Sequence, residues 1–236
     1  MRGMLLLFDV DGTLVTTAGV GISAMDRAGK AFFGDTFDAG AVQYAGRLDP
    51  LIIADLLVAH DKPVHEEAIE AFRGGYRDNL IDLLEESDKG RPCPGILELI
   101  DVLEAREDVT LGLLTGNYQE TGTIKLRACG IEPDRFPVHV WGNDSPDDPP
   151  CRTKLPPVGM ERYEAAHGQP PRETVIIGDT PHDITCAAAH GCRSLAVATG
   201  MFSVDELHAA GATLAVADLS DTQRIVEWFV SGEGTA

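Results

Sequence analysis

From Pro92 onward the chain alternates short apolar runs with amphipathic stretches. The runs have the length of buried strands, and apolar residues recur at helical spacing in the stretches between them. Gly130, Gly168 and Gly191 follow three of these stretches, where glycine typically ends a helix. The strands are predicted at 109–116, 138–142, 174–179, 194–199 and 213–217, and the helices at 95–107, 118–130, 155–168, 183–191 and 221–230. This alternation predicts an α/β fold, a doubly wound parallel sheet with helices on both faces.

The N-terminal part of the chain has a different pattern. The apolar run LLLFDV at 5–10 predicts a first buried strand and brings the expected sheet to six strands. Residues 16–90 then show no strand pattern. Helices are predicted there at 20–34, 49–60 and 65–87, with a kink or break at Gly74–Gly75, and turn-forming residues flank them at 11–21 and 87–95. We therefore expect a core made of residues 1–15 and 91–236, with an all-helical domain of residues 16–90 inserted into it.

Composition excludes several classes of protein. The net charge of −19 disfavours binding to nucleic acid or to acidic membrane surfaces, so an anionic ligand needs a local positive site. No apolar run has the roughly 18 residues that a membrane span requires, and Asp9 interrupts the N-terminal run too early for a signal peptide. The five cysteines are scattered and form no CxxC pair, which favours reduced thiols in a cytoplasmic protein.

Two carboxylates, Asp9 and Asp11, stand at the end of the first predicted strand. Residues two apart in a strand point the same way, while Val10 between them points into the core. In an open parallel sheet, ligands bind beyond the carboxyl ends of the strands. The position of the pair therefore agrees with a chemical role.

Other predicted strand ends carry polar groups that would meet this pair. They are Thr115 with the backbone amides of Gly116 and Asn117, the carboxylates Asp179 and Asp183, and a cation, Arg152 or Lys154. Backbone amides that open a helix can bind a phosphate oxygen. Several carboxylates in one pocket repel each other unless a divalent cation is present, and Mg²⁺ prefers oxygen ligands. The sequence therefore predicts a Mg²⁺ site.

These residues stand in four ordered motifs, FDVDGTL, LLTGN, the cation near 152–154, and IGDTPHD. Together they resemble the motifs of the haloacid dehalogenase superfamily of phosphohydrolases. The helical insertion resembles the superfamily's helical (C1-type) cap, and RPCPG at 91–95 resembles the return to the core in phosphoglycolate-phosphatase-like members. The resemblance implies a Rossmann-like core and a Mg²⁺-dependent phosphatase of the cytoplasm, monomeric or homodimeric, that hydrolyses a small phosphorylated metabolite through an aspartyl-phosphate intermediate.

The resemblance also implies roles for the acidic residues. Asp9 would attack phosphorus and would bind Mg²⁺ together with Asp179 and the backbone carbonyl of Asp11. The Asp11 side chain would be the general acid and base. Asp183 would bind the metal directly or through water, although an acidic residue at a helix start is also typical of capping.

Phosphate-binding roles follow in the same way. Thr115, with the amides of Gly116 and Asn117, would bind the transferring phosphoryl group, and a cation would neutralise its charge. The spacing to the next helix favours Arg152 as this cation, with Lys154 as the alternative.

One residue of the insertion resembles a specificity determinant. The sequence GRLD at 46–49 is similar to a cap loop that faces the substrate in some relatives, so Arg47 would read a second anionic group. The alternative is a solvated Arg47, with Asp49 capping the helix that follows.

Two other functions remain open at this point. A phosphosugar mutase of the β-phosphoglucomutase type would share Asp9, Asp11 and the cap, but would return the phosphoryl group to its substrate. A receiver-type phosphoacceptor also uses an acidic Mg²⁺ pocket, but the long insertion after the first strand fits it poorly.

Overall fold

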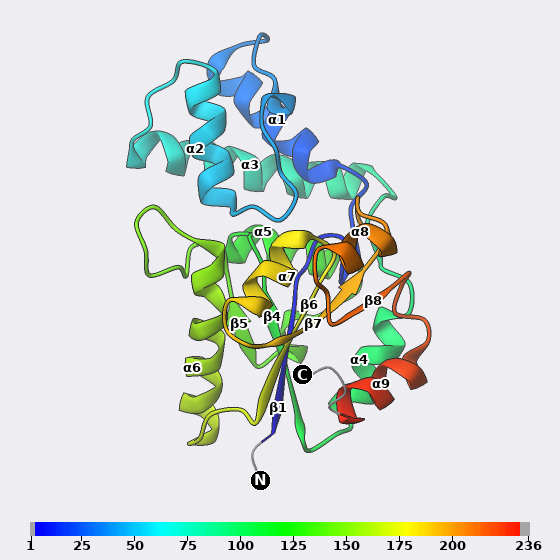
Figure 1. Cartoon of the computed structure of the whole chain (residues 1–236). Coiled ribbons are helices and arrows are strands. Elements are labelled where there is room, and N and C mark those ends of the chain that lie inside the picture. The colour runs from blue at the N-terminus through cyan, green and yellow to red at the C-terminus, as the bar shows by residue number, and fades with distance from the viewer. Residues whose placement is uncertain (1–2, 232–236) are drawn as a thin grey trace.

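A six-stranded, all-parallel sheet forms the centre of the computed structural model, which describes residues 3–231 (Figure 1). The strand order is β5-β4-β1-β6-β7-β8, so β1 lies between β4 and β6. The predicted sheet is confirmed. Its strands are β1 (Met4–Phe8), β4 (Val109–Leu114), β5 (Val138–Val140), β6 (Glu173–Gly178), β7 (Arg193–Val197) and β8 (Leu214–Val216).

Helices cover both faces of this sheet, and β1 shows why. Met4, Leu6 and Phe8 pack into the core with α4 (Ile96–Glu104), α5 (Gln119–Ala128) and α9 (Thr222–Ser231). Leu5 and Leu7 point to the other face, against α6 (Leu155–His167) and α7 (Pro181–Ala188). An unbroken apolar run is therefore buried on both sides, as expected for a central parallel strand. The short α8 (Val204–Ala209) is not among the predicted helices. The core also contains two 3₁₀ turns, η2 (Pro133–Arg135) and η3 (Arg152–Lys154), and a third, η1 (Ala39–Ala41), lies in the segment between the first two sheet strands.

Three helices between the first two sheet strands form a separate layer above the carboxyl ends of the sheet (Figure 1). They are α1 (Val20–Phe33), α2 (Asp49–Ala59) and α3 (Glu66–Glu86), and they share a hydrophobic cluster that includes Met25, Leu56 and Phe72. The cluster extends to Tyr118 of the core. We call these three helices the helical layer.

The predicted break at Gly74–Gly75 is wrong, because α3 is continuous from Glu66 to Glu86. The structure gives Gly75 a packing role instead. A Cβ added there would lie 2.6 Å from Cε2 of Phe32, so the missing side chain lets α1 and α3 approach closely.

The two connections between the helical layer and the core run side by side. Val15–Thr16 (β2) and Arg91–Pro92 (β3) pair as a short antiparallel ribbon, with Thr16 opposite Arg91. Both segments lie in the turn-rich stretches that flank the predicted insertion. The chain thus leaves the core for the helical layer and returns to it at one place.

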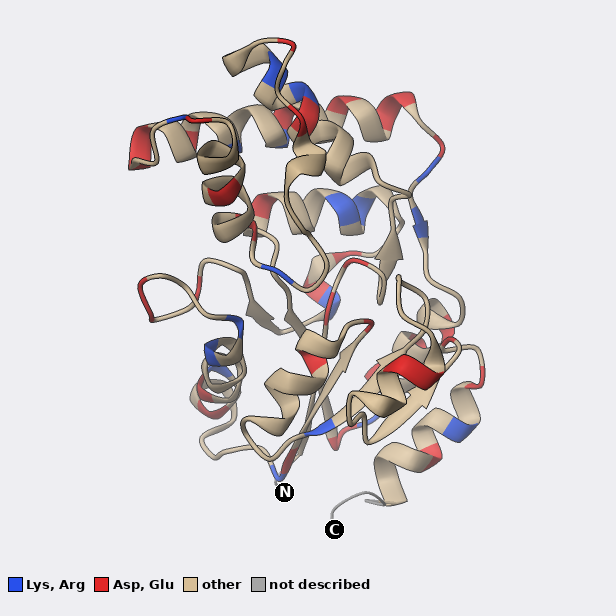
Figure 2. Ribbon diagram, turned by 45° about the horizontal axis from the view of Figure 1, so that its top comes forward, with Lys and Arg blue, Asp and Glu red and all other residues tan. Residues whose placement is uncertain are grey.

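Charge is spread over both layers. Figure 2 shows Asp and Glu on the helices around the sheet and on the helical layer, with Lys and Arg between them. Within residues 3–231, none of the helices combines the length and apolar character that a bilayer span requires.

Candidate active site

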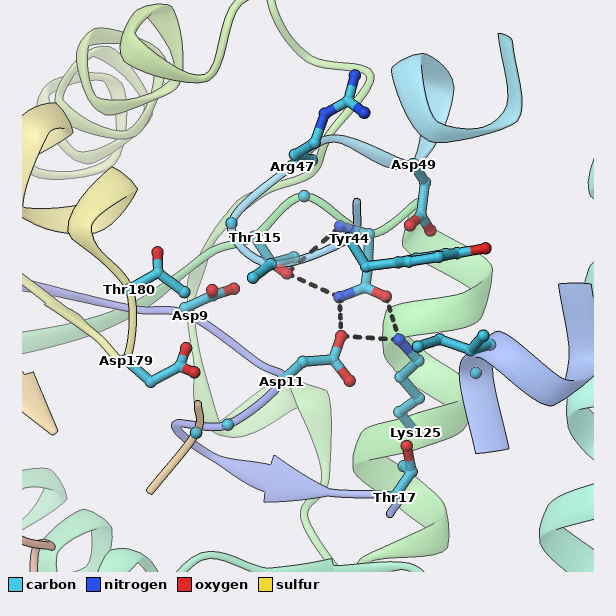
Figure 3. A pocket seen from close by; sticks show the side chains of 18 of the residues that line it. Asp9, Asp11, Thr17, Tyr44, Arg47, Asp49, Thr115, Lys125, Asp179 and Thr180 are labelled. Atoms are coloured by element: carbon cyan, nitrogen blue, oxygen red, sulfur yellow. Dashed lines mark hydrogen bonds and ion pairs between the residues drawn. The ribbon is translucent and has the colours of Figure 1, made fainter. Parts of the chain in front are cut away.

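The topology gathers the predicted site residues around one cavity. Because β1 lies between β4 and β6, the residues that follow these three strands are neighbours. A cavity of about 280 Å³ opens there, between the sheet and the helical layer (Figure 3). Its lining includes Asp9, Asp11, Thr115, Gly116, Asn117, Arg152 and Asp179.

One side of the cavity is a buried acidic centre. Carboxylate oxygens of Asp9, Asp179 and Asp183 lie within 4.8 Å of one another, and all three residues are buried. Arg152 crosses this centre: its Nη2 donates to Asp9 Oδ2 at 2.9 Å and to Asp183 Oδ1 at 2.6 Å. The 3₁₀ turn before α6 positions Arg152, which is itself only 8% exposed. One guanidinium therefore faces three carboxylates.

Burial, with the neighbouring negative charges, raises the pKa of two of the carboxyls. Burial raises the pKa of Asp179 to about 8, and the neighbouring charges of Asp183 and Asp9 add to the effect. Burial also raises the pKa of Asp9 to about 6, although Arg152 acts in the opposite direction. The ionised centre therefore requires more positive charge than Arg152 supplies.

Asp179 has the surroundings expected of a metal ligand. Among residues 3–231, none donates a hydrogen bond to its carboxylate. Two glycines border it, because a Cβ at Gly12 or at Gly200 would overlap Asp179 Oδ2. Asp9 and Asp179 thus offer clustered carboxylate oxygens, which are the ligands that Mg²⁺ prefers, so the donor set fits a divalent cation.

Asp183 is engaged on both of its oxygens. Oδ1 accepts from Arg152, while Oδ2 accepts from the backbone amide of Thr180 at 3.1 Å and from its hydroxyl at 2.7 Å. The bond from the Thr180 amide is half of a capping box at the start of α7, in which the Thr180 side chain accepts from the Asp183 amide in return. Asp183 therefore caps a helix and orients Arg152, which favours contact with a metal through water over direct ligation.

Asp11 lies in different surroundings, on the opposite side of the cavity. Its Oδ2 accepts from Lys125 Nζ at 2.7 Å and from Asn117 Nδ2 at 2.8 Å (Figure 3). The side chain of Asp11 is 45% exposed, whereas that of Lys125 is 6% exposed. Burial acts to lower the pKa of Lys125, but Asp11, Tyr76 and Asp49 outweigh it and raise that pKa, so the ammonium stays charged.

Thr115 and Asn117 form a small network beside Asp11. Asn117 Nδ2 also donates to the Thr115 hydroxyl at 2.8 Å, and Lys125 Nζ donates to Asn117 Oδ1 at 2.7 Å. Thr115 is fully buried at the end of β4. The network fixes these side chains relative to Asp11.

The remaining predicted residues fall into two groups. Gly116 lines the cavity and packs against the helical layer, because a Cβ at Gly116 would overlap the backbone carbonyl of Arg47. Lys154 is exposed and does not line the cavity, so the structure brings Arg152, and not Lys154, to the acidic centre. Arg47 lines the cavity, but its guanidinium pairs with Asp55 at 2.6 Å and points away from Asp9 and Asp179 (Figure 3).

Two charged residues of the site were not predicted. Lys125 lies near the C-terminal end of α5, where a cation ordinarily complements the helix dipole, so its sequence position carries no distinct signal. Asp49, considered only as a helix cap, lines the cavity and joins the two layers: its Oδ2 accepts from Tyr118 N and from Thr121 Oγ1, both at 3.2 Å. Burial raises the pKa of Asp49 to about 6.

Comparison with known proteins agrees with this arrangement. Residues 6–197 match the family model described as haloacid dehalogenase-like hydrolase. The chain is 24% identical over 221 residues to pyrophosphatase PpaX of Bacillus pumilus, covering 94% of this chain and 95% of the relative. It is 26% identical over 210 residues to a phosphoglycolate phosphatase of Mesorhizobium japonicum, covering 85% of each. The solved structure of CbbY from Rhodobacter sphaeroides in complex with phosphate superposes with a TM-score of 0.71 at 20% identity, covering 94% of this chain and 96% of that one.

Proposed function

Because this chain belongs to the haloacid dehalogenase-like hydrolases, we propose that it is a Mg²⁺-dependent phosphatase acting on a small phosphorylated metabolite. One observation carries the proposal: Asp9 and Asp11, two residues apart, face one cavity but have different partners, Arg152 for Asp9 and Lys125 for Asp11. Phosphoryl transfer through an enzyme carboxylate needs two carboxylates with distinct roles, a nucleophile and an acid/base. The curated relatives named as phosphatases support the same class of reaction.

In the proposed reaction the Asp9 carboxylate attacks phosphorus, and the bond from phosphorus to the alcohol oxygen breaks. Asp11 gives its proton to the departing alcohol. Its Oδ2 already accepts from Lys125 and Asn117, so Oδ1, to which no residue within 3–231 donates, is the oxygen free to carry that proton. Asp11 then takes a proton from water, which attacks the phosphorus of the aspartyl phosphate, releases inorganic phosphate and restores Asp9.

Groups around Asp9 would balance the negative charge of the transferring phosphoryl group. The Thr115 hydroxyl and the Asn117 amide would bind phosphoryl oxygens, with Arg152 on the side of Asp9. Mg²⁺ bound by Asp9, Asp179 and the backbone carbonyl of Asp11 would neutralise phosphoryl charge. The unpaired carboxylate of Asp179 supports this part of the proposal.

Residues 16–90 are proposed to act as a cap domain that closes over the cavity. The three helices share a hydrophobic cluster that also includes Tyr118 of the core. Arg73 of α3 forms an ion pair with Glu120 of α5 and lies over the Tyr118 ring. Arg73→Gln removes the ion pair and should enlarge the radius of gyration measured by small-angle X-ray scattering. An unchanged radius would contradict closure through this contact.

The decisive experiment measures phosphate release from p-nitrophenyl phosphate, with and without Mg²⁺. We expect turnover that requires Mg²⁺, and we expect Asp9→Asn to lower kcat by at least about 10³-fold. Asp147→Asn, the same substitution in an exposed loop, is the matched control and should behave as wild type. Full activity in Asp9→Asn, or turnover indifferent to Mg²⁺, would overturn the proposal.

Incubation with glucose 1-phosphate separates hydrolysis from mutase activity, because a mutase forms the 6-phosphate and releases no phosphate.

The five free cysteines support a cytoplasmic location as part of the same proposal.

A further inference from the structure

The cavity has two ends of different character. The end toward the sheet holds Asp9 and Asp179, where the phosphoryl group of the proposed reaction would bind. The end toward the helical layer is lined by apolar and aromatic side chains, among them Met25, Ile52 and Tyr76. The alcohol portion of a bound phosphate ester would extend into this second end, so its lining decides which alcohols fit.

All the cationic side chains that line the cavity within residues 3–231 are already paired. Arg152 bridges Asp9 and Asp183, and Lys125 binds Asp11. The third, Arg47, pairs with Asp55 at 2.6 Å, and both residues also line a second groove, which His182 of α7 borders. A second anionic group on the substrate would therefore meet no unpaired cation.

Asp49 gives the alcohol end of the cavity a carboxylate. It is 6% exposed and stands at the start of α2, held by the Tyr118 amide and the Thr121 hydroxyl on its Oδ2. Its Oδ1 receives no hydrogen bond from any residue between 3 and 231. Asp49 lines the cavity together with Tyr44, and its carboxylate lies beside the Tyr44 ring (Figure 3). A buried carboxylate oxygen accepts hydrogen bonds readily but repels another anion.

We propose that the substrate's alcohol portion carries no negative charge and donates a hydroxyl or ammonium hydrogen to Oδ1 of Asp49. This inference rests on the proposed phosphatase function and narrows its substrate class to phosphomonoesters of polyols or amino alcohols. Asp49 is then a specificity-determining residue. The class differs from the compounds for which two curated relatives are named, because phosphoglycolate carries a carboxylate and pyrophosphate carries a second phosphate.

A matched pair of esters tests this inference directly. Phosphoglycolate and 2-hydroxyethyl phosphate differ only by a carboxylate in place of a hydroxymethyl group, and O-phosphoethanolamine adds the cationic case. We expect kcat/KM for 2-hydroxyethyl phosphate to exceed that for phosphoglycolate by at least about 10-fold. Asp49→Asn keeps an acceptor for Tyr118 and Thr121 but removes the charge, so the ratio should fall at least about 5-fold. Asp82→Asn, on the exposed side of α3, is the control that should leave the ratio unchanged.

Binding to Asp9→Asn, measured by calorimetry with Mg²⁺ present, gives a readout without turnover. The uncharged and cationic esters should bind more tightly than phosphoglycolate, and Asp49→Asn added to this variant should reduce the difference. Equal or tighter binding of phosphoglycolate, or no binding of either uncharged or cationic ester, would overturn the inference. The experiments distinguish failure of the two proposals. If the protein hydrolyses p-nitrophenyl phosphate but prefers phosphoglycolate, the proposed substrate class is wrong and the phosphatase function stands. If the uncharged and cationic esters bind selectively but no ester is hydrolysed, the phosphatase function is wrong and the binding preference stands.

Discussion

Asp9 and Asp11 belong to one short motif, yet they stand in two different electrostatic environments. Asp9 is 5% exposed and lies in the acidic centre with Asp179 and Asp183. It shares its cation, Arg152, with Asp183. Asp11 has a 45% exposed side chain and Lys125 as its own cation. Two carboxylates that are two residues apart thus have different surroundings, because their partners come from distant parts of the chain.

The difference shows how one motif can supply two chemical roles. A crowded, buried centre favours the binding of a cation, because its ionised carboxylates lack sufficient positive charge. A carboxylate that reaches water and is fixed by two donors on one oxygen keeps its other oxygen available for proton transfer. Four substitutions and one change of conditions test this contrast, beginning with the largest expected effect.

Arg152→Ala should affect the acidic centre most strongly. It leaves Asp9 and Asp183 buried without their shared cation, which typically costs about 3–5 kcal/mol of unfolding free energy. Activity on p-nitrophenyl phosphate should fall by about 10³-fold, since the orientation of both carboxylates is lost. Urea denaturation and steady-state kinetics measure the two effects. Arg162→Ala, which removes an exposed pair with Asp144, is the control and should cost about 1 kcal/mol or less.

The acidic centre should also make stability depend on pH and on the metal. The pKa of Asp179 rises from 3.8 to about 8 on folding, so the folded protein holds this proton more tightly than the unfolded chain. In EDTA, the unfolding free energy should therefore fall between about pH 4 and pH 8, by a few kcal/mol. Mg²⁺ favours the ionised form and should raise the melting temperature more at pH 8 than at pH 5.

Asp179→Asn provides the comparison for that measurement, because it removes the titrating group while keeping its size. The fall in stability in EDTA should become shallower in this variant, and Mg²⁺ should stabilise it less. Identical pH profiles for Asp179→Asn and wild type would count against the described environment.

Lys125→Met should have an intermediate effect, on the Asp11 side. Asp11 keeps the hydrogen bond from Asn117 and its contact with water, so the loss in stability should be about 1–2 kcal/mol. We expect kcat to fall about 10-fold, because Asp11 and Asn117 lose their common donor. Wild-type kcat in this variant would mean that Lys125 does not position Asp11.

Lys154→Ala should have the smallest effect. This lysine is exposed and lies outside the cavity, so activity should stay within about two-fold of wild type and stability within about 0.5 kcal/mol. A large loss of activity would mean that Lys154, and not Arg152, is the cation that acts on the phosphoryl group.

The sheet could be predicted because each strand is a continuous apolar run followed by turn-forming residues. The register of β1 between β4 and β6 then brings Asp9, Thr115 and Asp179 together, as strand-end chemistry predicts. The family resemblance, together with the spacing to the next helix, favours Arg152 over Lys154, and the structure places Arg152 at the acidic centre.

What could not be predicted depends on contacts between elements distant in the chain. Lys125 meets Asp11 across 114 residues, and Asp49 meets Thr121 across 72. Gly75 gives a local signal for a broken helix, but the packing of Phe32 against it decides the outcome. In each case the sequence shows the residue type, whereas the tertiary neighbour determines its role.

The ribbon of β2 and β3 has a consequence for how this protein can change over evolution. Thr16 and Arg91 lie opposite each other on neighbouring strands, which are typically about 4.7–4.9 Å apart. The 74 residues between them leave and rejoin the core at one point, and a tight turn of two residues would suffice to join the strands as a hairpin. From the side of the core, a change in the length of the intervening segment therefore requires no change in the order of the six strands that place Asp9 and Asp11.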